Sequence, residues 1–169
     1  MLEQEFWDLI DQARGAAAGS MHRLAGHIRG RLAELAPADI EDYARFWCAS
    51  IDAAYRWPLW DAGVVWLGWF GDDAFRDFRG WLISRGRKTF EKVIADPDSL
   101  ADEPDDCASP FAEVWDNLIH DVSEQKTGRA IATPVPTGPR DPAGTRIDVK
   151  DPVAVGRAFP RLAARTGNA

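Results

Sequence analysis

The sequence lacks long apolar runs and the short motifs that mark common catalytic sites. No uncharged run exceeds ten residues, which is about half of the roughly 20 residues that a membrane-spanning helix needs. The first ten residues, MLEQEFWDLI, are acidic, whereas a secretory signal peptide begins with basic residues. We therefore expect neither a membrane span nor a signal peptide.

Cysteine and histidine are also scarce. Cys48 and Cys107 form no CxxC pair, and this usage is typical of a reduced, cytoplasmic chain. We expect Cys48 to be a core thiol, and the acidic loop around Cys107 disfavours the thiolate that a nucleophile needs. The three histidines show no metal-binding spacing. Because GxSxG, GxGxxG and GxxxxGK[ST] are all absent, we predict no metal and no cofactor.

Charge is divided unevenly along the chain. Residues 1–128 carry 13 Lys and Arg against 24 Asp and Glu, whereas residues 129–169 carry 7 Lys and Arg against 3 Asp. An acidic body repels phosphate, so we expect no duplex nucleic acid as a partner. The basic tail suits either the acidic body or a separate acidic partner. Because the tail has apolar residues of its own, Phe159 and Leu162, we expect it to dock on the body.

Apolar residues recur three and four positions apart through most of the body, which predicts amphipathic helices. Ser20 can cap the second helix, and Pro37 can open the third. The apolar run 59–70, LWDAGVVWLGWF, suits a buried helix or a buried strand, and we favour a helix because its neighbours are helical. The acidic segment 96–109 is predicted to be a loop, and a helix should follow it and end by Gly128.

Four prolines in the sequence PVPTGPRDPAGTR predict an extended linker, and a short helix should follow Asp151 and Pro152. The only alternation that suits a strand is RAIAT at 129–133. We therefore predict an all-α fold, a single bundle of six or seven short helices with the Pro-rich, basic tail packed on it. The predicted parts are an acidic helical domain, 1–128, and the tail, 129–169.

The stretch 55–86 holds five of the eight tryptophans. Asp72 follows Gly71, so we expect Asp72 to cap a new helix and Asp73 to interact with its dipole. This stretch suits either a capped helix start above an aromatic core or a polar site at an aromatic pocket. For the second alternative, the candidate ligand-binding residues are Asp72, Asp73, Arg76, Arg79, Trp60, Asp61, Trp69 and Trp81.

These residue types suit three kinds of ligand. Carboxylates beside tryptophan faces attract a guanidinium or ammonium group by ion pairing and by cation–π contact. Paired carboxylates can instead hold a divalent cation, and Arg79 can hold a carboxylate or a phosphate. The first combination uses most of the candidate residues, so we favour a cationic ligand.

The leading functional hypothesis is a small cytoplasmic binding module that engages a protein, a peptide or a small cationic ligand through residues 55–86. The alternative is an enzyme of unknown class, tailoring or hydrolytic, that acts on an amino-acid or peptide substrate. Asp72, Asp73 and Arg79 would then lie in its site. A third hypothesis is a metal-dependent hydrolase that uses the aspartates. The sequence does not indicate an oligomeric state.

Several segments resemble one bacterial family, the domain of unknown function 4240: FWDLIDQAR at 6–14, AYRWPLWDAG at 54–63, DDAFRDFRGWLISRGR at 72–87, ADPDSLAD at 95–102 and PRLAAR at 160–165. The resemblance implies a small bacterial cytoplasmic protein of a kind common in actinobacteria, and it brings no activity to carry over. The family's pattern has small polar residues before the paired aspartates, where this chain has Trp69 and Phe70. If relatives bind a ligand at that turn, the two rings narrow or fill the pocket here.

Overall fold

The computed structural model describes residues 1–68, 71–104, 114–129 and 141–167, and all the regular elements in these ranges are helices. In chain order they are α1 (Glu3–Ala17), α2 (Met21–Glu34), α3 (Pro37–Ala53), α4 (Trp57–Leu67), α5 (Asp72–Ser84), α6 (Arg87–Ala95), the 3₁₀ helix η1 (Pro97–Asp102), α7 (Val114–Thr127), α8 (Pro152–Ala158) and α9 (Pro160–Thr166). The all-α prediction is confirmed. Within the described ranges, no helix is both long and apolar enough to cross a membrane.

The predicted number of six or seven helices is too low, for two local reasons. The predicted loop 96–109 begins with η1, which has Pro97 in its first turn. The single helix predicted in the tail is two helices, because the backbone leaves the helical region at Phe159, where φ is −136°. The helix favoured for the apolar run 59–70 is confirmed for residues 59–67, which belong to α4, whereas residues 69–70 lie outside the described residues. Residues 130–133 of the suggested strand lie outside the described residues.

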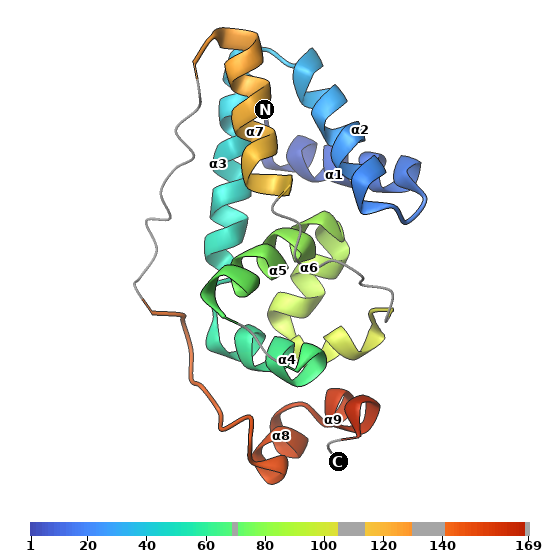
Figure 1. Ribbon diagram of the computed structural model, residues 1–169, viewed down its shortest axis with the longest axis vertical. Helices are drawn as coiled ribbons and strands as arrows, with labels where there is room; N and C mark the ends of the chain where they lie inside the picture. The colour runs from blue at the N-terminus through green and yellow to red at the C-terminus, as the bar shows by residue number, and fades with distance from the viewer. Residues whose placement is uncertain (69–70, 105–113, 130–140, 168–169) are drawn as a thin grey trace.

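The helices form an upper and a lower group along the long axis of the molecule (Figure 1). In the upper group, α1 packs on α2, and α7 packs on both α2 and α3. The long helix α3 reaches down to α5, while α4, η1 and α9 contact one another at the lower end. The helices α4 and α5, which carry the described candidate residues, therefore lie between the upper group and the tail.

Local sequence explains most helix ends. The Ser20 side chain accepts a hydrogen bond from the backbone N–H of Arg23, and Pro37 occupies the first turn of α3, so both predicted starts are confirmed. The prediction that Asp72 caps α5 is wrong. Gly71 is the N-cap and Asp72 is the first helical residue, where its charge still faces the positive end of the helix dipole.

The tail docks on the body, and Phe159 and Leu162 are both buried there, as predicted. Both oxygens of the buried Asp98 carboxylate accept backbone N–H groups at the start of α9, from Arg161 at 3.0 Å and from Leu162 at 2.9 Å. The Arg165 guanidinium donates to the backbone carbonyl of Ala101 at 2.8 Å. A segment of the body thus supplies the cap that α9 lacks in its own sequence.

Candidate ligand-binding site

Large aromatic rings join α4 to α5. The Trp60 ring lies 4.5 Å from that of Phe75, and the Trp66 ring lies 5.5 Å from that of Trp81, measured between centroids. Trp60 and Trp81 are 7% and 2% exposed. These two candidate residues therefore belong to the aromatic core, and their faces are covered by other rings rather than open to a ligand.

Arg79 is buried on the inner side of α5, with 8% of its surface exposed. Its Nη1 donates to the carbonyl oxygen of Ile51 at 3.0 Å, and its guanidinium lies 4.8 Å from the ring centroid of Tyr55. Ile51 belongs to the last turn of α3, whose carbonyls have no partner within the helix. Arg79 thus satisfies a carbonyl at the end of α3 and places a positive charge at the negative end of its dipole.

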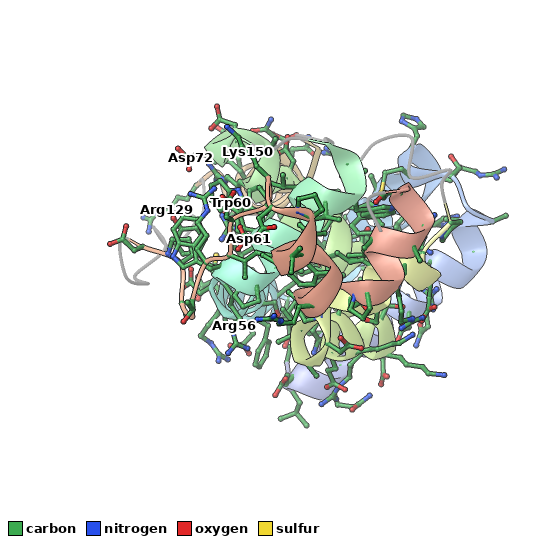
Figure 2. The ribbon with its side chains drawn as sticks, turned by 90° about the horizontal axis from the view of Figure 1, so that it is seen from below. Arg56, Trp60, Asp61, Asp72, Arg129 and Lys150 are labelled. Carbon is green, nitrogen blue, oxygen red and sulfur yellow. The ribbon has the colours of Figure 1, made fainter. Side chains whose placement is uncertain are left out.

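The acidic start of α5 lies at the surface of the molecule. Asp72 and Asp73 are both exposed, as is Arg76 one turn later, and Asp72 lies toward the edge of the view in Figure 2. The structure therefore does not place these carboxylates beside the buried guanidinium of Arg79. The eighth candidate, Trp69, and its neighbour Phe70 lie outside the described residues, so their predicted effect on a pocket stays a prediction.

Asp61 shows the least expected environment among the candidates. Its side chain is fully buried on α4 and faces the tail rather than α5, beside the tail backbone in Figure 2. Oδ2 accepts the backbone N–H of Ile147 at 2.8 Å. Oδ1 has no hydrogen bond, but it forms an ion pair with Nε of Arg146 at 3.4 Å. Burial raises the pKa of Asp61, and the N–H of Ile147 and the charge of Arg146 partly oppose this shift.

Arg146 and Trp57 complete this arrangement, and neither was among the predicted site residues. The Arg146 guanidinium lies 4.6 Å from the ring centroid of Trp57, which is a cation–π contact. Next to it, the backbone N–H of Trp57 donates to the carbonyl of Ala143 at 2.8 Å, and the N–H of Ala143 donates to the carbonyl of Tyr55 at 2.9 Å. The sequence indicated that a basic tail would meet an acidic body, but no local signal pairs residues so far apart.

A second arginine of the tail lies on another tryptophan of α4. The Arg165 guanidinium is 5.8 Å from the ring centroid of Trp66. Trp57 and Trp66 are both half-buried, in contrast to Trp60. The tryptophans at the surface of α4 are therefore the ones that meet guanidinium groups.

The histidines lie away from α4 and α5. His22 and His27 are exposed on α2, and His120 is half-buried on α7. Among the residues that the structure describes, no group of three His, Cys, Asp or Glu side chains is arranged to hold a metal ion. Cys48 is half-buried on α3, and Cys107 lies outside the described residues.

Comparison with known proteins gives a family and no individual relative. No curated protein and no solved structure matches the chain. The family model described as Protein of unknown function (DUF4240) matches residues 1–125, which include α4, α5 and η1 but not the tail. Because this match spans well over half of the 169 residues, the chain belongs to the family of Protein of unknown function (DUF4240).

Proposed function

We propose that the chain is a cytoplasmic binding module that engages a basic segment of a protein or peptide through α4 and the start of α5. The observation that carries this proposal is the position of Arg146, whose guanidinium lies over Trp57 and beside the buried Asp61. Tryptophan faces and carboxylates are the groups that recognise guanidinium and ammonium ions. A small cationic ligand is the alternative occupant of the same surface.

The distribution of charge supports a basic partner. The body, residues 1–128, carries nearly twice as many acidic as basic side chains, and such a field attracts a positively charged segment from a distance. Asp72 and Asp73 are exposed at the first turn of α5, a few residues after the half-buried Trp66. These two carboxylates are placed to steer a basic segment toward α4 rather than to bury it.

No observation in the described residues favours the enzyme alternative with Asp72, Asp73 and Arg79 in the site. The Arg79 guanidinium already donates to Ile51, whereas the two aspartates face solvent. A substrate that touched all three groups would have to extend from the exposed first turn of α5 to a guanidinium that is buried two turns further along the helix. The binding module therefore remains the function that the geometry supports best.

A titration of the full chain tests this proposal. The ligands are an arginine-rich peptide and a peptide of equal length with glutamate in place of arginine, and binding is followed by calorimetry and by the NMR signals of the indole N–H groups. We expect only the basic peptide to bind, and salt should weaken it because the charges that attract it are exposed. Equal responses to both peptides would overturn the proposal.

Two double variants test which acidic side chains contribute to binding of the basic peptide. The double substitution Asp72→Asn with Asp73→Asn should weaken binding of the basic peptide about three- to tenfold, mainly through slower association. Glu41→Gln with Glu124→Gln removes the same charge from exposed positions on α3 and α7. This control should change binding far less, and an equal loss in both variants would show that net charge alone attracts the peptide.

A further inference from the structure

The segment 141–147, called the strap below, holds its place on α4 through few contacts. Ala143 exchanges two backbone hydrogen bonds with Tyr55 and Trp57, in the pattern of a single parallel β-bridge. Ile147 donates its N–H to Asp61, and Arg146 lies over Trp57. Main-chain pairing with one anchored side chain is the way in which many protein modules bind extended peptides.

In this contact, the carboxylate of α4 is more deeply buried than the strap side chain that it meets. Asp61 is completely buried, and its Oδ1 accepts no hydrogen bond, although a buried carboxylate is costly unless both oxygens are satisfied. The Arg146 side chain, by contrast, is 54% exposed, and its Nε is 3.4 Å from Oδ1. An arginine that approached more directly would donate hydrogen bonds to Oδ1, so the site accepts a better ligand than the strap.

The strap is also the part of the tail that can detach from the body while α8 and α9 stay docked. Within the strap, Pro142 is buried and Ile147 is half-buried, whereas residues 143–146 are exposed. Further along the tail, Val155, Phe159 and Leu162 are buried, and Asp98 holds the start of α9. Segments with few buried apolar contacts open locally at low free energy while the remainder of the structure stays folded.

The family comparison separates the site from its occupant. Tyr55, Trp57 and Asp61 lie within residues 1–125, which match the family model, and the strap lies beyond that match. The site therefore lies in the part of the chain that the family model matches, and the strap that covers it lies outside that part.

We propose that the segment from Tyr55 to Asp61 is the binding site for an extended, arginine-containing peptide of a partner protein, and that the strap competes with this peptide within the chain. The partner's main chain pairs with Tyr55 and Trp57, and its guanidinium lies between the Trp57 ring and Oδ1 of Asp61. This inference rests on the proposed function, and it adds the position of the site, the form of the ligand and its regulation.

Mass action then determines the response to the partner. A strap that is closed most of the time lowers the apparent affinity for the peptide by the fraction of chains that are open. Because the strap is tethered, its effective concentration at the site is high, on the order of millimolar for short flexible connections. Weakening the strap should therefore strengthen binding in trans, which is opposite to the effect expected when a residue that contacts the partner is lost.

The test uses the full chain and a synthetic peptide with the sequence of residues 142–149, PAGTRIDV. We expect Arg146→Ala to bind this peptide about tenfold more tightly than the unmodified chain does, since the cis arginine no longer competes. Gly144→Ala should act in the same direction, because Gly144 has φ +89° and an added Cβ would lie 3.1 Å from Pro58. Arg157→Ala removes the same charge from an exposed position on α8 and should not change binding.

A second peptide with glutamine in place of arginine isolates the guanidinium. We expect it to bind Arg146→Ala about tenfold more weakly than the arginine peptide does. Combining Arg146→Ala with Asp61→Asn should remove this preference, and because asparagine has the shape of aspartate, its oxygen can still accept the N–H of Ile147. The NMR signal of the Trp57 indole should shift only with the arginine peptide.

The outcomes separate this inference from the proposed function. If Arg146→Ala and Arg157→Ala bind the arginine peptide equally, or if Asp61→Asn keeps the preference for arginine, the site and the competition are wrong. The proposed function survives that result as long as the arginine-rich peptide still binds and depends on Asp72 and Asp73. If no basic peptide binds any variant, both proposals fail.

Discussion

Two buried aspartates hold two parts of the tail, the strap and the start of α9, and they do so differently. Asp98 is 6% exposed, and both of its oxygens accept backbone N–H groups of α9. Asp61 is fully buried, but only one of its oxygens has a hydrogen bond. A fully satisfied carboxylate stabilises one arrangement, whereas a half-satisfied one can gain a better partner. The α9 end is therefore structural, and the strap end is the candidate for exchange.

The largest loss in unfolding free energy should come from Leu162→Ala, which tests whether α9 is a structural anchor. Leu162 is a completely buried residue of α9, and loss of a buried leucine side chain costs about 2–5 kcal/mol in unfolding free energy. Urea unfolding measures this loss. Val153→Ala, at a position that is 68% exposed on α8, is the matched control and should cost less than about 0.5 kcal/mol. Similar losses in both variants would mean that α9 is not a structural anchor.

Replacing the two aspartates by asparagine should give the next largest difference in unfolding free energy. Asp98→Asn leaves one oxygen for two buried N–H groups, so we expect a loss of about 1–3 kcal/mol in unfolding free energy. Asp61→Asn keeps the one existing hydrogen bond and removes a buried charge, so its cost should stay below about 1 kcal/mol. Asp96→Asn, at an exposed position before η1, is the control. Equal losses of unfolding free energy at Asp61 and Asp98 would contradict the distinction between a structural α9 and an exchangeable strap.

Gly144→Ala should loosen the strap and leave α9 in place. The left-handed backbone at this position disfavours alanine by roughly 1 kcal/mol. Hydrogen exchange should become faster at the Ala143 and Ile147 amides, whose acceptors are Tyr55 and Asp61, but not at the Ala163 amide of α9. Faster exchange along the whole tail would instead show that the two ends open together.

The smallest effect should be a difference in pH dependence. The pKa of Asp61 is raised by burial above its ordinary value of 3.8, so the folded chain binds this proton more tightly, and stability falls as pH rises from about 3.8 through the raised value. The pKa of Asp102 is lowered by Lys92 and Arg161, so its contribution is present above about 3.8 and is lost as pH falls through the lowered value.

Thermal melts across this range test the two signs. Relative to the unmodified chain, Asp61→Asn should gain stability as pH rises, and Asp102→Asn should lose it. The same trend in both variants would contradict the assignment of opposite shifts. Asp102 is exposed enough for salt to weaken its effect, whereas the effect of the buried Asp61 should resist salt.

The sequence was sufficient for the helical class, for most helix starts and for the docking of the tail. These predictions depend on local features, such as the apolar spacing, the Ser20 cap and the opposite charges of tail and body. It was not sufficient for the site, because the partners are remote in sequence. Arg79 was expected beside acidic groups on its own helix, but it binds the Ile51 carbonyl of another helix. Asp61 was expected in one site with the aspartates of α5, but its carboxylate binds the tail.

The cap that Asp98 provides has a consequence for how the chain acquires its structure. The helix α9 has seven residues, and a helix of that length is not stable alone in water. Since its first N–H groups find their acceptors on the body, α9 becomes helical only where the body has already folded. Order in the C-terminal segment is therefore a late event, and its protection from proteases reports the completion of the bundle above it.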